Sequence, residues 1–268
     1  MLQEWKAMEK PEEEEIRVRL AAAKEKLAKQ QLLIKEQKIP VLVLMEGWGT
    51  AGKGSVIGQV IQNIDPRFFK VESMGEKSEE ERRKPFLYRY FKRIPEEGKF
   101  VFLDSGWMDE IVKDELHGKL SDEDYAKRIE SVRRFERQLT DNGYLVMKFF
   151  LHIPEKEQAK RIEHLEHEKD TVWRVSKNDL WQNRHYEKCE EAFSSYMKNT
   201  NMPSAPWYIV DAKSRKWTEL QVLETLTQGI EIALSNQKLA VPLLQNVFPL
   251  VRMPLLAEVP LDLSLIHI

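Results

Sequence analysis

The clearest pattern in the chain is a set of short apolar runs separated by charged stretches. The runs cover residues 40–45, 100–104, 144–153 and 207–211. A run without polar alternation is typical of a strand that is buried on both faces of a sheet. The charged segments between the runs have the pattern of helices. Strands that alternate with helices predict a parallel α/β sheet with helices on both faces.

Residues 11–37 predict a helix with one apolar face. Its apolar side chains recur at spacings of three, four and seven, and they are Ile16, Leu20, Ala23, Leu27 and Ile34. Acidic residues begin the segment and lysines end it, which suits the helix dipole. Too few heptads are present for a coiled coil, so we interpret the segment as a helix that packs on the domain.

The composition excludes several classes of protein but does not indicate an activity. The 268 residues include 42 Lys and Arg and 44 Asp and Glu, which gives a formal net charge of −2. This balance provides no general attraction to nucleic acid or to anionic membranes, so we predict neither as a partner. The single cysteine, Cys189, excludes an internal disulfide and a four-cysteine metal site. The polar start lacks a signal-peptide pattern, which predicts a cytoplasmic protein.

The first apolar run leads into a glycine-rich segment that ends in lysine. Gly47, Gly52 and Lys53 have the spacing Gly-x-x-x-x-Gly-Lys, and a helical stretch follows. In such a loop, backbone N–H groups converge on phosphate oxygens, and the helix N-terminus and the lysine add positive charge. We predict that Gly47, Gly52, Lys53, Gly54 and Ser55 bind phosphate and that Lys53 is catalytic. The alternative is a glycine-rich turn with a chance lysine, which fits this context poorly.

The second apolar run ends in an acidic residue, Asp104. P-loop phosphotransferases hold Mg²⁺ partly through an acid that ends another strand. We predict that Asp104 is catalytic and binds Mg²⁺, and a helix-capping aspartate is the alternative.

Further motifs follow one another along the chain. They are Asp65-Pro66-Arg67, the aromatic segment 85–91, the segment 148–153 and Ala205-Pro206-Trp207. Together with the phosphate loop, they resemble the polyphosphate kinase 2 family over about residues 16–234. Members of this family move phosphate between inorganic polyphosphate and nucleotides. The resemblance implies a P-loop nucleotide-kinase-like three-layer α/β/α sandwich with a parallel sheet and a helical lid.

The resemblance also implies polyphosphate and AMP or ADP as substrates, with Mg²⁺ as cofactor. Four basic residues are candidates for binding polyphosphate: Arg89, Arg133, Arg137 and Lys148. Ion pairing within their own helix is the alternative for Arg133 and Arg137.

Four positions depart from the family pattern. The family has an aspartate where this chain has Gly49, and arginines where it has Ser105, Glu110 and Glu115. Arginine forks suit phosphate oxygens, so these changes predict a partly eroded site. Two functions therefore stay open: a polyphosphate:AMP/ADP phosphotransferase, and a non-catalytic P-loop module that supports an active second domain. An ATP-dependent nucleotide kinase is a third, which the loop permits but the other motifs do not favour.

The end of the chain predicts a linker. Four prolines lie between Pro242 and Pro260, which is typical of an extended segment. We expect a P-loop domain at 1–235, an inter-domain linker at 236–262 that resembles tandem members of the family, and a non-native tail at 263–268. A second homologous domain is then a partner in the full-length protein, and a homo-oligomer is left open.

Overall fold

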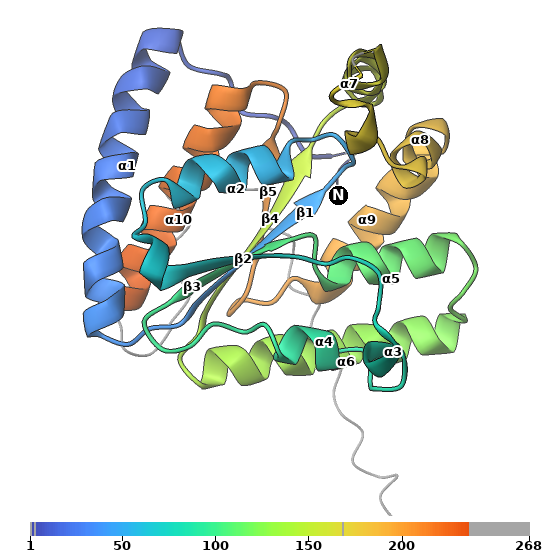
Figure 1. Cartoon of the computed structure of the whole chain (residues 1–268), viewed down its shortest axis with the longest axis horizontal. Coiled ribbons are helices and arrows are strands. Elements are labelled where there is room, and N and C mark those ends of the chain that lie inside the picture. Colours follow the sequence, from blue (N-terminus) through green and yellow to red (C-terminus); the bar gives the residue numbers. More distant parts are fainter. Residues whose placement is uncertain (1, 3, 168, 236–268) are drawn as a thin grey trace, which may run out of the picture.

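The structure is a computed structural model that describes residues 2, 4–167 and 169–235 (Figure 1). The predicted linker at 236–262 and the predicted tail at 263–268 lie outside these described residues. In the described part, no helix combines the length and apolar character needed to cross a membrane.

A parallel sheet lies at the centre of the fold, with the strand order β2-β3-β1-β4-β5. The strands are β1 (Val41–Gly47), β2 (Phe69–Ser73), β3 (Phe100–Asp104), β4 (Leu145–His152) and β5 (Trp207–Asp211). The four apolar runs are confirmed as β1, β3, β4 and β5. Since β1 lies between β3 and β4, its register places Met45 beside Asp104. The glycine-rich loop after β1 therefore begins next to Asp104, the acid at the end of β3.

The edge strand β2 was not predicted from the sequence. It reads Phe-Lys-Val-Glu-Ser, and none of its five residues is fully buried. An edge strand that is half exposed and mixed in polarity lacks the apolar run that marks the other four strands.

Helices cover both faces of the sheet, as Figure 1 shows. On one face lie α2 (Lys53–Ile61) and α10 (Arg215–Ser235), with α1 (Glu13–Glu36) packed against α10. On the other face lie α5 (Trp107–Leu116) and α6 (Asp122–Asp141), with α9 (Tyr186–Thr200) packed against both. This arrangement confirms the α/β/α sandwich. The apolar face predicted for residues 11–37 is buried along α1, which packs on α10.

Short helices connect these layers. Between β2 and β3 lie α3 (Glu79–Arg82) and α4 (Tyr88–Phe91), and η1 (Pro66–Phe68) precedes β2. Between β4 and α9 lie α7 (Glu155–His167), η2 (Val172–Arg174) and α8 (Lys177–Arg184), which we call the lid segment. In Figure 1, α7 and α8 lie beyond the carboxyl ends of the central strands, where the glycine-rich loop also emerges.

Lys148 lies in the core rather than at a ligand-facing surface. Its side chain is fully buried, and its Nζ donates to Glu136 Oε2 at 2.7 Å and to the Thr200 carbonyl at 2.8 Å. Glu136 also accepts a hydrogen bond from Trp107 Nε1 at 3.1 Å. This pair connects α6, β4 and α9, so Lys148 is not available to bind polyphosphate. The apolar run at 144–153 placed this lysine in a strand, but neither the run nor the resemblance revealed its acidic partner.

We predict that breaking this buried pair is strongly destabilising. Lys148→Met leaves the Glu136 carboxylate without its cation and lowers the free energy of unfolding by about 3–5 kcal/mol. Adding Glu136→Gln recovers more than half of the loss, because the amide oxygen still accepts from Trp107. Urea unfolding at pH 7 measures both effects.

The exposed pair Arg134–Glu130 on α6 provides the control. Arg134→Ala changes the free energy of unfolding by less than about 1 kcal/mol. Equal losses for Lys148→Met and Arg134→Ala would contradict the prediction.

Candidate active site

The glycine-rich loop connects β1 to α2 as predicted. Gly47 and Gly52 have φ angles of 130° and 93°, in the region that favours glycine. A Cβ on Gly47 would also approach the Leu151 backbone nitrogen to 2.7 Å, so the loop can pass β4 only without a side chain there. Gly52 is the left-handed cap of α2, and the unpaired N–H groups of the first helical turn follow it. The loop therefore has the geometry that binds phosphate.

Lys53 folds back over the loop that precedes it. Its Nζ donates to the carbonyl oxygens of Gly47 at 3.1 Å and Trp48 at 3.0 Å. Phosphate oxygens in the loop could take the place of these two carbonyls, since all are acceptors for the same ammonium group.

Asp104 lies beside the start of α2. Its Oδ2 is 3.1 Å from the place that a Cβ on Gly54 would take, so the glycine after Lys53 leaves room for the carboxylate. Burial raises the pKa of the Asp104 carboxyl, and the nearby Lys53 ammonium opposes this shift. Ser55 is exposed in the same helical turn. The structure therefore brings the predicted loop residues and Asp104 together.

These oxygen donors fit a magnesium ion that is shared with a substrate. Among the described residues, no group of three or more His, Cys, Asp or Glu side chains is placed to hold a metal alone. Mg²⁺ commonly takes only one or two protein carboxylates and completes its shell with phosphates and water. Asp104 and the hydroxyl of Ser55 could supply the protein ligands in such an arrangement.

Asp109 and Glu46 are two further acids at this site that we did not select from the sequence. Asp109 lies in the first turn of α5, where burial raises its pKa and Lys53 opposes the shift. Glu46 is the next-to-last residue of β1 and is buried. A carboxylate just before a glycine-rich loop is the signal that could have identified Glu46. Asp109 carries no such signal, because it stands in an ordinary charged helix.

Glu46 connects the phosphate loop to the turn that follows Asp104. Its Oε1 accepts hydrogen bonds from the backbone N–H groups of Gly106 at 2.9 Å and Met108 at 3.2 Å. Burial, together with the nearby Asp109 carboxylate, raises the pKa of Glu46 to about 8. The turn holds Ser105 at a φ of 60°, a costly conformation for a residue with a side chain. The two hydrogen bonds therefore hold a strained turn in place.

The lid segment packs directly on the phosphate loop at Gly49. The Gly49 N–H donates to Gln182 Oε1 at 3.0 Å, and Gln158 Nε2 donates to the Gly49 carbonyl at 3.3 Å. A Cβ on Gly49 would lie 2.6 Å from the Cγ of Asp179 on α8 and closer still to its Oδ1. The space next to Gly49, where the family's aspartate would begin, is therefore filled by the carboxylate of Asp179.

Arg161 and Tyr186 also hold the loop in place. Arg161 on α7 donates from Nη1 to the carbonyls of Thr50 and Ala51, each at 3.3 Å, and from Nη2 to Ala212 at 2.8 Å. The Trp48 ring stacks on Tyr186 with centroids 3.9 Å apart and planes within 5°. These partners come from α7, the β5–α10 connection and α9, so the loop backbone is held from several sides.

The remaining predicted polyphosphate ligands do not gather at the loop. Arg89 is buried on α4 beside Glu81 and Glu110. Arg133 and Arg137 are exposed on α6. Since α6 ends just before β4 begins, Arg137 lies near the amino edge of the sheet, opposite the phosphate loop. Its ion pair is with Asp141 of the same helix, at 3.6 Å.

The positions that depart from the family pattern have different environments. Ser105 lies in the strained turn after Asp104, whereas Glu110 and Glu115 lie on α5. Glu110 forms ion pairs with Lys77, Arg89 and Arg128. Glu115 is half-buried, which raises the pKa of its carboxyl.

Comparison with known proteins identifies the family of the chain. The sequence profile described as Polyphosphate kinase 2 matches residues 10–238. A polyphosphate:AMP phosphotransferase of Pseudomonas syringae pv. tomato is 29% identical over 199 residues, which cover 74% of this chain and 40% of that protein. An AMP/ADP-polyphosphate phosphotransferase of Meiothermus ruber is 28% identical over 215 residues, which cover 79% and 80%.

A crystal structure of polyphosphate kinase 2 from Arthrobacter aurescens shares the fold, with a TM-score of 0.76 and 25% identity. The match covers 79% of this chain and 77% of that one. The chain thus spans less than half the length of the Pseudomonas syringae relative. It spans more than three quarters of the Meiothermus ruber and Arthrobacter aurescens proteins.

We predict that Glu46 makes stability fall as the pH rises. Between about pH 4.5 and 8, the folded protein keeps a proton on Glu46 that the unfolded chain releases, so the folded state loses up to about 4 kcal/mol across this range. Glu46→Gln keeps the acceptor for Gly106 and Met108 but cannot titrate. Urea unfolding at pH 5, 6.5 and 8 should show the variant increasingly more stable than the parent. A difference that does not change with pH would contradict this role.

We also predict that an aspartate at position 49 displaces the lid segment. Gly49→Asp would collide with Asp179 and repel its charge, so amide hydrogen exchange should accelerate across α8. Adding Asp179→Ala to the same chain should restore part of the protection, because it removes both the collision and the repulsion. Gly58→Ala is the control, since a Cβ at Gly58 meets no atom within 4 Å. Unchanged exchange in Gly49→Asp would show that the lid does not rest on this glycine.

Proposed function

The chain belongs to the polyphosphate kinase 2 family, and we propose that it forms part of a polyphosphate-dependent nucleotide phosphotransferase. The observation that carries this proposal is the phosphate loop with Lys53 at its end and Asp104 facing the same helical turn. The relatives' names supply the substrate classes, polyphosphate and AMP or ADP. The proposed location is the cytoplasm, on the sequence argument alone.

In this proposal, the chain stabilises charge on the phosphoryl group that is transferred. The N–H groups at the start of α2 bind its oxygens, and Lys53 leaves the Gly47 and Trp48 carbonyls to follow it. Asp104 and Ser55 would hold Mg²⁺, which neutralises phosphate charge when it is bound.

A second candidate is a module that supports an active second domain. Two observations favour it: Glu110 neutralises the basic side chains of Lys77 and Arg89, and Asp179 fills the space of the missing loop carboxylate. The partial coverage of the Pseudomonas syringae relative supports a longer natural protein with a second domain. The predicted linker belongs to this proposal, and the oligomeric state is left open.

We predict weak phosphotransfer by the 268-residue chain with polyphosphate, AMP or ADP, and Mg²⁺. Lys53→Ala should lower the rate by about 100-fold or more, because it removes a charge that acts on the transferred group. Ser105→Arg with Glu110→Arg should raise the rate by restoring cations near the phosphates. Chromatography of the nucleotide products measures all three chains.

Two other outcomes identify the competing functions. No turnover by the parent, with a gain in the arginine variant, supports the non-catalytic module. Nucleotide phosphorylation with ATP as donor and without polyphosphate contradicts the polyphosphate proposal.

A further inference from the structure

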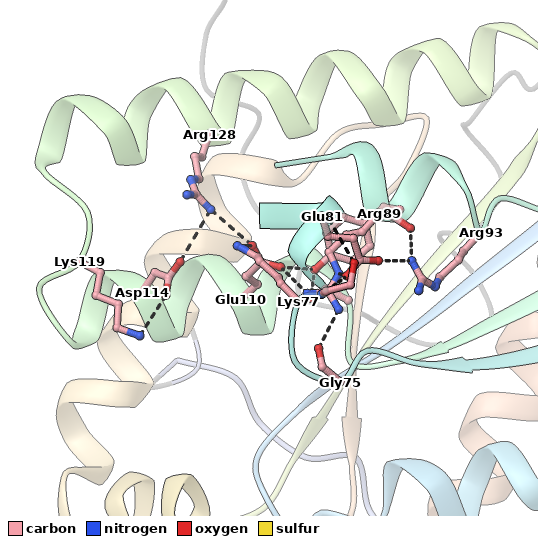
Figure 2. Close-up of polar contacts among 12 residues, drawn as sticks. Gly75, Lys77, Glu81, Arg89, Arg93, Glu110, Asp114, Lys119 and Arg128 are labelled. Atoms are coloured by element: carbon pink, nitrogen blue, oxygen red, sulfur yellow. Dashed lines mark hydrogen bonds and ion pairs between the residues drawn. The ribbon is translucent and has the colours of Figure 1, made fainter. Parts of the chain in front are cut away.

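A cluster of basic side chains converges on the carboxylate of Glu110 (Figure 2). The cations are Lys77, Arg89 and Arg128, and we call these three residues with Glu110 the Glu110 cluster. They come from three separate parts of the chain: the segment after β2, helix α4 and helix α6. Glu110 itself lies in the first turn of α5. The fold therefore assembles the cluster from elements that are distant in sequence.

The two oxygens of Glu110 serve all three cations and one phenol. Lys77 Nζ lies 2.6 Å from Oε1, Arg89 Nη1 lies 3.4 Å from Oε2, and Arg128 Nη1 lies 3.6 Å from Oε1. Tyr90 donates its hydroxyl to Oε2 at 3.0 Å. The arginine contacts are longer than good hydrogen bonds, which have donor–acceptor distances of about 2.7–3.2 Å. Oε1 of Glu110 accepts no hydrogen bond from the described residues, so its contacts with Lys77 and Arg128 are ion pairs without the alignment of hydrogen bonds.

The hydrogen-bonding capacity of the cluster is correspondingly incomplete. Arg89 is 6% exposed, yet its buried Nε makes no hydrogen bond with the described residues. The same holds for the buried Nη1 of Arg128. Arg89 does donate from Nη2 to the Gly75 carbonyl at 2.7 Å, which holds the guanidinium in place. These oriented but unsatisfied donors suit an anion with more oxygens than a carboxylate, such as a phosphate group.

Other acids near the cluster do not take the place of Glu110. Glu81 lies 3.7 Å from Arg89 but pairs more closely with Arg93, at 3.1 Å. Asp114, one turn further along α5, lies 3.8 Å from Arg128 and also pairs with Lys119. Figure 2 shows Asp114 at one side of the group next to Lys119, and Glu81 beside Arg89 on the side that faces Arg93. Removing Glu110 would leave Lys77 without its ion-pair partner.

The cluster is linked to the turn that follows Asp104. The Tyr90 hydroxyl contacts both the Gly106 carbonyl in this turn, at 3.1 Å, and Glu110 Oε2, at 3.0 Å. A chain of phosphates that leaves the loop at Lys53 could therefore pass the start of α5 and meet Lys77, Arg89 and Arg128. The negative charge of Glu110 stands in that path.

We propose that Glu110 is a built-in anion that occupies an oligophosphate-binding site formed by Lys77, Arg89 and Arg128, and that it keeps this site closed. The carboxylate takes the position of one phosphate group and neutralises the cations. Polyphosphate as the natural ligand rests on the proposed function, whereas the closed anion site rests on the geometry of the cluster.

The test measures binding of inorganic tripolyphosphate by isothermal titration calorimetry, without nucleotide or Mg²⁺. Every chain carries Lys53→Ala, which weakens binding at the phosphate loop. Glu110→Gln keeps the side-chain shape and the acceptor for Tyr90 but removes the charge. Tripolyphosphate affinity should rise at least about tenfold, because like-charge repulsion is removed from the site. Lys77→Ala in the same chain should abolish most of this gain.

Asp114→Asn is the matched control, because it removes one carboxylate from the same helix at the margin of the cluster. Its effect on affinity should stay within about threefold. An equal gain in Asp114→Asn, or no gain in Glu110→Gln, overturns the proposal. Failure of phosphotransfer does not affect this result, since no nucleotide is present.

Loss of stability in Glu110→Gln is also informative. If the variant has a lower unfolding temperature than the parent, tripolyphosphate should raise it more than it raises that of Asp114→Asn, since an added anion replaces the missing charge. A variant that stays unfolded with tripolyphosphate contradicts the proposal, because a phosphate then cannot substitute for the carboxylate.

Discussion

The buried carboxylate of Glu46 holds the two halves of the site together. It is the next-to-last residue of β1, just before the phosphate loop, and it accepts hydrogen bonds from the N–H groups of Gly106 and Met108 after Asp104. The Ser105 N–H also donates to the Met45 carbonyl at 3.0 Å, so β1 holds the strained turn through both its backbone and the Glu46 side chain. The position of Asp104 relative to Lys53 therefore depends in part on Glu46. Its raised pKa follows from the same burial that makes the bridge rigid.

The residues of the glycine-rich loop also pack against the rest of the fold. Gly47 leaves room for the β4 backbone, Trp48 stacks on Tyr186, and the Gly49 N–H donates to Gln182 of the lid segment. Substitutions in these residues would disturb packing between β1, α8 and α9 whether or not phosphate binds. A loop held in this way keeps its shape independently of catalysis, so its presence alone does not measure activity.

The sequence predicted those features that depend on local patterns. The apolar runs identified four strands, and the glycine–lysine spacing identified the loop. It did not predict β2, whose edge position leaves it without an apolar run, or the burial of Lys148, whose partner Glu136 is on another element. The missing aspartate at Gly49 was visible in the sequence, but Asp179 in its place was not. Such pairings depend on which helices the fold brings together.

The Glu110 cluster extends the same reasoning to the departures from the family pattern. Three cations that converge on one point repel each other unless an anion joins them. In a protein that binds polyphosphate, the ligand can supply that anion, and in this chain Glu110 supplies it from α5. The glutamate at position 110 therefore has two effects. It removes the positive charge of the family's arginine, and its own negative charge stabilises the three cations without a ligand. In this proposal, Glu110 keeps the charges of Arg89 on α4 and Arg128 on α6 compensated when no polyphosphate is bound.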